Sequence, residues 1–177
     1  MPVRTYALVM GVIFALIGIL GFIPAFVSQP PLDAPPLALE AGHGLLFGLF
    51  AVNWVHNLIH LASGIWGVAA YRSFSNARLY ARVVAVVYGV FIVMGFIPVL
   101  WTTFGLAPLH GHDIWLHALI AISAAYFGFG SARQESRYAV EDQVGRTGAT
   151  TAAPMAVEPT AGDVRADDRQ RRTGSRR

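Results

Sequence analysis

Residues 45–71 read LLFGLFAVNWVHNLIHLASGIWGVAAY, a run of 27 residues without a charged side chain. A helix needs about 20 mostly apolar residues to cross the hydrocarbon core of a bilayer. The run is long enough to do so, and its composition predicts a membrane helix. Its few polar side chains are Asn53, His56, Asn57, His60 and Ser63.

Three further apolar runs accompany this one along the chain. The four predicted helices cover residues 6–27, 45–71, 83–101 and 113–132. None of the runs alternates with period two, as the strands of a membrane barrel do. Residues 1–132 are therefore predicted to form an all-α integral membrane domain with four transmembrane helices. A cleaved signal peptide is the alternative for the first run, which is about twice the usual length of such a segment.

Charged residues are distributed unevenly. Residues 1–132 hold seven of them and residues 133–177 hold the other sixteen. The predicted loops 28–44 and 102–112 contain no Lys or Arg. Because basic segments stay on the cytoplasmic side during insertion, this pattern predicts a multi-pass protein of the inner (plasma) membrane with both termini in the cytoplasm.

Residues 133–177 are polar, rich in Arg, Asp, Ala, Thr and Gly, and show no helical period. Such a segment buries too little apolar surface to offset its conformational entropy, so we predict a disordered cytoplasmic tail. Its arginine-rich end is suited to anionic lipid headgroups, although it could equally serve only to reinforce orientation. The expected partners are the lipid bilayer and a second copy or another membrane protein, and no nucleic acid.

The membrane domain repeats itself. The letters GFIP occur at 21–24 and again at 95–98, an offset of 74, and after the shorter second loop the offset falls to 57. Both copies start on the same side of the membrane, which predicts two tandem parallel two-helix repeats about an axis along the membrane normal. Pairs matched at these offsets are Arg4 with Arg78, His60 with His117, and His56 with Asp113.

The histidines carry most of the available chemistry. All six fall in an outer loop or the outer half of a predicted helix: His43, His56, His60, His110, His112 and His117. Polar side chains recur at steps of three and four in 45–71, so they share one face of that helix. If the repeat brings the second and fourth helices together, one cluster forms near the outer surface. Its members are Asn53, His56, Asn57, His60, Asp113 and His117.

Three interpretations of this cluster remain open. The side chains could hydrogen-bond to one another and hold the helices together. They could bind a divalent metal ion such as zinc, copper or iron, since bundle metal sites use side chains one helical turn apart. They could also bind a small ligand or pass protons. The predicted metal ligands are His56, His60, His117 and Asp113, with Asn53 or Asn57 orienting them.

Two predictions concern helix ends. Asp113 stands where the N-cap of the fourth helix belongs, accepting backbone N–H bonds. Pro24 and Pro98 are expected to end the first and third helices, because proline lacks the N–H that a helix interior needs.

The sequence offers little support for catalysis. It contains no Cys, no Lys and no glycine-rich phosphate loop, and its helix serines stand isolated. We therefore expect no enzymatic activity. The interpretation is a structural, partner-binding or ligand-binding membrane module, with a metal or proton-handling site as the alternative. A divalent metal ion is the only cofactor that these residues suggest.

The motif N-x-x-H-N-x-x-H-x-x-x-G-x-x-G at 53–67, the two GFIP segments and G-x-D-x-x-x-H at 111–117 resemble a family of bacterial four-span proteins, domain of unknown function 4383. The resemblance covers about residues 4–132, and the tail has no counterpart. It implies an integral membrane protein of the cell envelope, with no established activity or cofactor. The four-helix plan is also similar to that of the DoxX-like proteins, without a shared motif.

Overall fold

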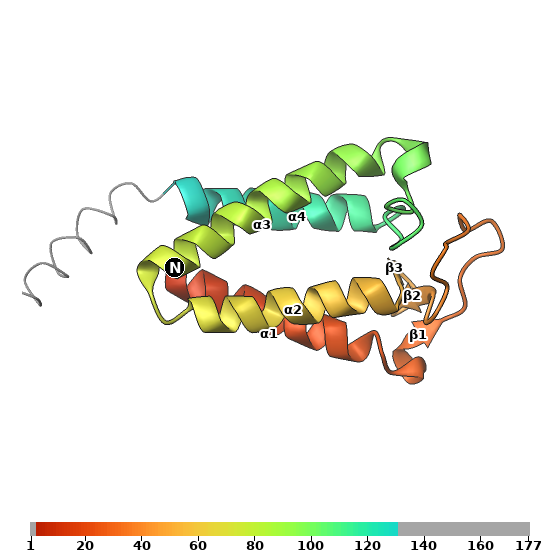
Figure 1. Cartoon of the computed structure of the whole chain (residues 1–177), viewed down its shortest axis with the longest axis horizontal. Helices are drawn as coiled ribbons and strands as arrows, with labels where there is room; N and C mark the ends of the chain where they lie inside the picture. The colour runs from red at the N-terminus through yellow and green to blue at the C-terminus, as the bar shows by residue number, and fades with distance from the viewer. Residues whose placement is uncertain (1–2, 131–177) are drawn as a thin grey trace, which may run out of the picture. The chain divides into compact units, whose positions relative to one another are not determined.

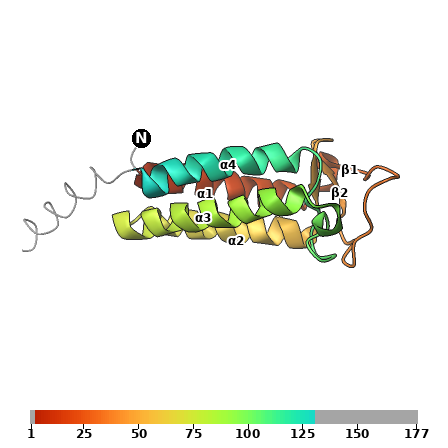
Figure 2. The same ribbon diagram turned by 90° about the horizontal axis from the view of Figure 1, so that it is seen from above.

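The computed structural model describes residues 3–130, which form four α-helices and a small sheet (Figure 1). The strands and the longer loops lie together at one end of the helices, and both views place the N-terminus near the other end (Figure 2). The chain packs as two helix pairs, α1 with α2 and α3 with α4. The helices are α1 (Val3–Leu20), α2 (Trp54–Ala70), α3 (Phe74–Gly95) and α4 (Asp113–Phe129).

Residues 45–52, predicted to be helical, belong instead to two strands and the turn between them. The antiparallel sheet has the order β1 (Val27–Ser28), β2 (Gly44–Leu46), β3 (Phe50–Val52). Between β2 and β3, Phe47 and Gly48 adopt φ angles of 55° and 73°, the left-handed region that reverses the chain. The second helix therefore begins at Trp54, nine residues later than predicted. These strands are as apolar as a membrane helix, so composition could not separate the two.

The other helix boundaries also differ from the predicted ones. Helix α1 covers Val3–Leu20 rather than 6–27, and α3 covers Phe74–Gly95 rather than 83–101. The early start of α3 follows from Ser73, whose side chain accepts a hydrogen bond from Asn76 N and caps the helix. A search for uncharged runs missed this first part because it contains arginines. Helix α4 ends at Phe129, and 131–132 lie outside the described residues.

The prolines follow the ends of their helices, in agreement with the prediction that these helices do not continue past them, whereas Asp113 does not have the predicted role. Helices α1 and α3 stop before the prolines, and Pro24 and Pro98 each begin a short 3₁₀ turn. The N-cap of α4 is His112, whose side chain makes no capping bond, and Asp113 is the first helical residue. The prediction that Asp113 caps α4 is therefore wrong. The helix begins one residue earlier than a cap at Asp113 requires.

The two helix pairs achieve close packing with different small residues. A Cβ on Gly11 of α1 would lie 2.6 Å from Val68 N of α2, and a Cβ on Gly64 would meet the backbone of Ala15. Helices α1 and α2 therefore touch backbone to backbone. In α3, a Cβ on Gly89 would meet nothing within 4 Å, and alanines fill much of the buried interface of the second pair, among them Ala81, Ala85, Ala121 and Ala124. A glycine of this pair approaches the backbone of the partner helix near the end of α4, where a Cβ on Gly128 would lie 3.0 Å from Arg82 N.

At the end of the bundle where α1 and α3 begin, each helix pair makes the same kind of hydrogen bond. Arg4 Nε donates a hydrogen bond to Tyr71 O at 2.8 Å, and Arg78 Nε donates one to Gly128 O at 3.1 Å. The two donors are 74 residues apart in the chain and the two acceptors are 57 apart. In each case an arginine on the first helix of a pair satisfies a carbonyl left open at the C-terminus of the second.

Aromatic contacts deeper in the bundle match in the same way. Phe14 packs against His60 with ring centroids 5.4 Å apart, and Tyr88 packs against His117 at 4.9 Å. Phe14 and Tyr88 also stack on each other at 5.6 Å with nearly parallel rings. This stack joins the two helix pairs at the middle of the bundle, with one histidine on each side of it.

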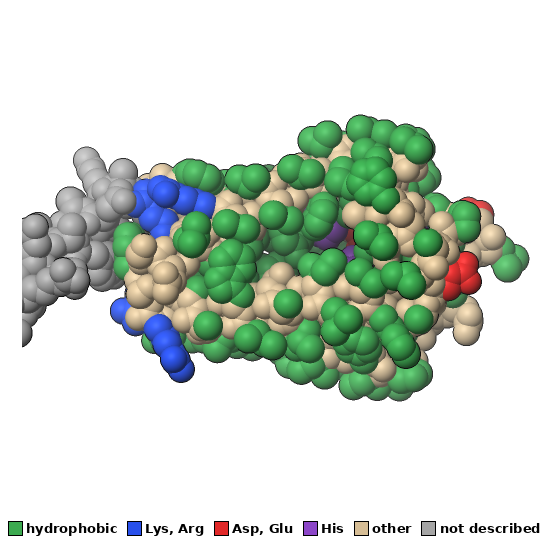
Figure 3. All heavy atoms as spheres, viewed as in Figure 1, with side chains coloured by type: hydrophobic (Ala, Val, Ile, Leu, Met, Phe, Trp, Pro, Cys, Tyr) green, Lys and Arg blue, Asp and Glu red, His purple; other side chains and the backbone are tan. Residues whose placement is uncertain are grey.

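The surface of the helices is largely apolar, and hydrophobic side chains cover most of the face shown in Figure 3. Large hydrophobic residues are more than half exposed on every helix, among them Leu16, Ile65, Val93 and Ile122. Within residues 3–130, α1 and α3 are long and apolar enough to cross a membrane, and α4 is a shorter apolar helix. The arginines lie at one end of this face and acidic residues at the other.

Candidate functional site

The polar residues at the start of α2 fall into two groups with different contacts. Asn53 caps the helix, accepting a hydrogen bond from His56 N at 2.9 Å. Its side-chain N–H groups donate to Leu39 O at 2.9 Å and Leu106 O at 2.8 Å. Asn53 is fully buried and ties the loop between β1 and β2 to the loop between α3 and α4. It positions the start of α2 and does not join the histidines.

Three imidazoles meet between the helix pairs. His56 and His60, one turn apart on α2, approach with their Nε2 atoms 3.1 Å apart. His117 of α4 lies opposite them, and one ring nitrogen from each of the three falls within 4.8 Å of the others. All three side chains are at least nine-tenths buried. The structure thus brings together three of the four predicted metal ligands.

The ring nitrogens of this three-histidine cluster are poorly satisfied. The Nδ1 atoms of His56, His60 and His117 are buried and make no hydrogen bond within the described chain. Within residues 3–130, the three side chains hydrogen-bond to each other only along α2, between His56 and His60. A buried polar atom left without a partner is costly, so this arrangement is typical of a site that awaits a ligand.

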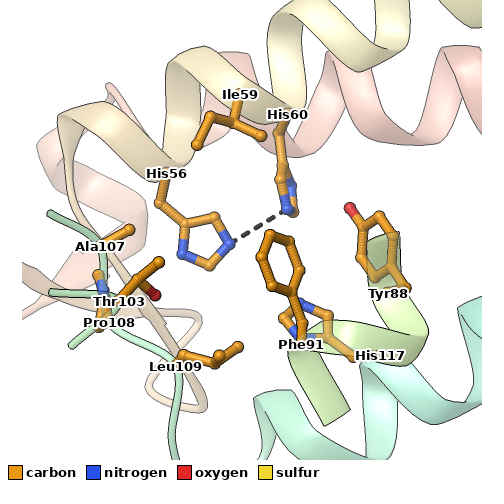
Figure 4. Close-up of a pocket in the computed structure, with 10 residues that line it drawn as sticks. All are labelled: His56, Ile59, His60, Tyr88, Phe91, Thr103, Ala107, Pro108, Leu109 and His117. Carbon is orange, nitrogen blue, oxygen red and sulfur yellow. Dashed lines mark hydrogen bonds between the residues drawn. The ribbon is translucent and has the colours of Figure 1, made fainter. Parts of the chain in front are cut away.

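A cavity of about 40 Å³ adjoins the three imidazoles. A water molecule needs about 10–15 Å³ by this measure, so the cavity has room for an ion with one or two waters and is far too small for a haem. Figure 4 shows the rings of the cluster facing this space, and Figure 3 shows histidine at the bottom of a hollow between the helix pairs. The remaining lining residues are Ile59, Tyr88, Phe91, Thr103, Ala107, Pro108 and Leu109.

Asn57 and Asp113 lie outside this group. Asn57 is buried against α1, where a Cβ on Gly21 would collide with its side-chain amide. Asp113 is 2% exposed, and the backbone of Ala51 faces both its carboxyl group and the imidazole of His56. The predicted six-residue cluster therefore separates into a three-histidine cluster and three structural neighbours.

The comparison with known families agrees with the extent of this domain. The family described as domain of unknown function (DUF4383) matches residues 4–130. The chain belongs to this family. No curated protein and no solved structure matches it. The DUF4383 domain thus coincides with the helices and loops described above and includes the whole three-histidine cluster.

The remaining histidines of the DUF4383 domain lie in its outer loops. Burial lowers the pKa of His43 below its ordinary value, and Glu40 opposes that shift. Burial also lowers the pKa of His110, with a further lowering from His43. His112 is exposed, and its Nδ1 accepts a hydrogen bond from Trp115 Nε1 at 3.1 Å. None of these three reaches the three-histidine cluster.

Two polar residues of the cavity wall, Tyr88 and Thr103, were not predicted from the sequence. Tyr88 lies on α3, the helix from which no site residue was predicted, and Thr103 lies in the second outer loop. A signal for Tyr88 was present in the sequence, because it pairs with Phe14 at the offset of 74 and differs from it only by a hydroxyl. No comparable signal marks Thr103, since its place depends on how the loop folds over the cavity.

Proposed function

We propose that this DUF4383 protein crosses the inner membrane four times and binds one transition-metal ion in the outer half of its helix bundle. The ligands are His56, His60 and His117. The observation that carries the proposal is the convergence of one ring nitrogen from each of these side chains within 4.8 Å, beside a cavity of ion size.

The four-span arrangement has support from length and surface. Helices α2 and α4, at 17 residues, are about 25 Å long, and α3, at 22 residues, is about 33 Å long. These lengths are close to the roughly 30 Å of a hydrocarbon core. Exposed apolar side chains on all four helices suit lipid contact better than contact with water. The arginines at one end of the helices support a cytoplasmic location for that end.

We further propose that α1–α2 and α3–α4 are copies of one two-helix unit. The arginine-to-carbonyl bonds and the aromatic–histidine contacts described above support this, because each pair falls at the same two offsets. The outer loops add a third match, since Phe47-Gly48 and Phe104-Gly105 all have positive φ. Duplication explains how His60 and His117 come to face one another across the stack of Phe14 on Tyr88.

The metal hypothesis fits the cluster better than helix bridging does. Bridging requires side chains of different helices to satisfy one another, whereas the three imidazoles hydrogen-bond to each other, within the described chain, only along α2, between His56 and His60. Two imidazoles spaced i, i+4 on a helix with a third from a facing helix is a common way to hold a metal. The second candidate function is proton handling, in which His56 and His60 share a proton. The 3.1 Å distance between their Nε2 atoms favours it.

The donor set narrows the choice of ion. A tetrahedral ion with metal–nitrogen bonds of about 2.0–2.1 Å holds its nitrogen ligands about 3.3–3.4 Å apart. Small rotations of the three rings would reach that spacing from the present one. Neutral imidazoles suit zinc, copper and iron, and the lack of oxygen ligands disfavours magnesium and calcium. We propose a binding module rather than an enzyme.

Elemental analysis of the full chain, purified in detergent and equilibrated with Zn²⁺, Cu²⁺ or Fe²⁺, tests the site. We expect about one ion per chain, and none in the variant His56→Ala/His60→Ala/His117→Ala. The matched control removes the three loop histidines instead, as His43→Ala/His110→Ala/His112→Ala, and should keep the ion. Equal loss in both variants, or retention in both, would remove the proposal. If the first variant does not fold, the single change His60→Gln replaces it.

Sidedness is tested with single cysteines, because the chain contains none of its own. Leu32 is fully exposed in the first outer loop, and Ser75 is exposed at the start of α3. A membrane-impermeant maleimide added to intact cells should label Leu32→Cys at once, and Ser75→Cys only after permeabilisation. Labelling of both positions in intact cells would overturn the proposed topology.

A further inference from the structure

We propose that the metal site is an open one, whose fourth position faces the hydroxyl groups of Tyr88 and Thr103 and accepts a water molecule or a small anion. This inference rests on the proposed metal site and names the ligand class that the bound ion would take. The number of protein ligands is the first observation that supports an open site. Three imidazoles leave a tetrahedral ion with one free position, whereas structural sites use four protein ligands.

The walls of the cavity limit what can fill that position. Five of the other lining residues are apolar and offer no side-chain donor: Ile59, Phe91, Ala107, Pro108 and Leu109. Asp113, the nearby carboxylate predicted as a ligand, lies outside the group of converging nitrogens. Apart from the histidines, Tyr88 and Thr103 alone among the described lining residues carry a polar side-chain atom. A ligand from solution, held by these two hydroxyls, therefore completes the site best.

Tyr88 is held firmly by its ring, so its hydroxyl is not needed for packing. The ring stacks on Phe14 at 5.6 Å and meets His117 edge-on at 4.9 Å. At the matching position of the first helix pair, Phe14 makes the corresponding contact with His60 without a hydroxyl. Figure 4 shows the Tyr88 hydroxyl turned toward the His60 side of the cavity. The added oxygen thus faces the site, where it can hydrogen-bond to a ligand on the ion.

Thr103 has an independent mark of constraint. Its φ angle is 48°, in the left-handed region that a β-branched residue rarely adopts. Such backbone conformations persist only where surrounding structure imposes them, and they cluster at functional sites. Figure 4 shows the Thr103 side chain on the His56 side of the cavity, across from Tyr88. The two side chains therefore line the cavity from opposite sides.

The size of the cavity sets the size of the ligand. Its volume of about 40 Å³ accommodates the ion together with one or two water-sized groups. The occupant is consequently water, hydroxide or a narrow anion such as azide, and not an organic substrate.

The test uses the full chain in detergent, loaded with Co²⁺ as a spectroscopic substitute, and titrated with sodium azide. We expect the visible absorption bands of the bound Co²⁺ to shift with azide, at a stoichiometry of one azide per ion. Tyr88→Phe and Thr103→Val should each weaken azide binding by about tenfold while Co²⁺ stoichiometry stays unchanged. The control is Tyr126→Phe, which alters a tyrosine exposed on the outside of α4 and should behave as the parent.

The outcomes separate this inference from the one beneath it. If Co²⁺ binds through the three histidines but azide changes nothing, the site is closed and this inference is wrong while the metal site stands. If azide binds equally to Tyr88→Phe, Thr103→Val and Tyr126→Phe, the hydroxyls have no part in it, and the inference is again wrong. If no Co²⁺ binds to the parent chain, the proposed metal site fails and this inference fails with it.

Discussion

The two helix pairs of this protein make matching contacts but carry different residues at some of the positions that the offsets of 74 and 57 relate. In the first pair, α2 presents His56 and His60 one turn apart; at the matching positions of the second pair, α4 presents Asp113 and His117. His60 and His117 both enter the cluster, whereas His56 enters it and Asp113 does not. The comparison shows how a scaffold with two similar halves can hold an asymmetric site.

The packing of the pairs differs as well. Where α1 and α2 meet, Ala15 faces Gly64, and at the matching positions of the second pair the sizes are exchanged, as Gly89 and Ala121. The first pair is close enough that a methyl group at Gly64 would collide with backbone, while the space beside Gly89 is open. Each pair therefore tolerates different substitutions at equivalent places.

The largest effect is expected at the histidines. His60→Ala and His117→Ala should each weaken metal binding by at least about 100-fold, since loss of a ligand costs more than loss of an outer-shell partner. The two should behave alike because their positions match. Isothermal titration with Zn²⁺ measures this, and a large difference between the two variants would break the equivalence of the halves.

His56 and Asp113 sharpen the same comparison. His56→Ala should weaken Zn²⁺ binding as strongly as His60→Ala, whereas Asp113→Asn should leave the dissociation constant within about twofold, because the Asp113 carboxylate is not among the converging ligand atoms. Asparagine preserves the shape of the buried side chain. A strong loss of Zn²⁺ affinity in Asp113→Asn would show that the carboxylate is a metal ligand after all.

The next effect concerns the two glycines. Gly64→Ala should destabilise the protein by about 1–3 kcal/mol, because the added methyl group meets the backbone of α1. The identical substitution Gly89→Ala should stabilise it by about 0.4–1 kcal/mol, since the helix gains propensity and no contact opposes it. Unfolding in mixed detergent micelles measures both. Effects of the same sign would contradict the difference in packing.

A smaller contrast is expected at the arginines. Arg78 is 7% exposed and Arg4 is more open, although both donate to a helix C-terminus. Arg78→Gln should therefore cost about 1.5–3 kcal/mol and Arg4→Gln less than about 1 kcal/mol. Thermal unfolding measures the difference, with the exposed Arg72→Gln as control. A greater loss of stability in Arg4→Gln than in Arg78→Gln would contradict the expectation that the more buried arginine contributes more.

The smallest effect is a pH dependence in the outer loops, where Asn53 of the first half corresponds to His110 of the second. Burial lowers the pKa of His110 below its ordinary 6.5, so the unfolded chain takes up a proton that the folded chain refuses. Stability should fall as the pH drops below about 6.5. Between pH 7.5 and pH 5, Tm should fall more in the parent than in His110→Asn, because the parent loses additional free energy of unfolding of less than about 1 kcal/mol. Parallel curves of Tm against pH for the parent and His110→Asn would exclude His110 as a source of the pH dependence.

Much of the helical plan could be predicted from the sequence, and its errors have a physical origin. The apolar runs located all four helices because length and lack of charge decide which segments suit a bilayer. They misplaced the start of α2, since an apolar hairpin at 44–52 has the same composition as a helix. The apolar runs also omitted the first residues of α3, because Arg78 and Arg82 lie within that part of the helix.

The sequence by itself determined the family, the four apolar segments and the spacing of His56 and His60 on one turn, because composition and helical period are local properties. Only the tertiary structure decided which neighbour each polar side chain meets. His56 and Asn57 are about 100° apart around α2, so one faces His117 and the other faces α1. Packing between helices sets that choice, and it selected three histidines, left Asp113 out and brought Tyr88 in.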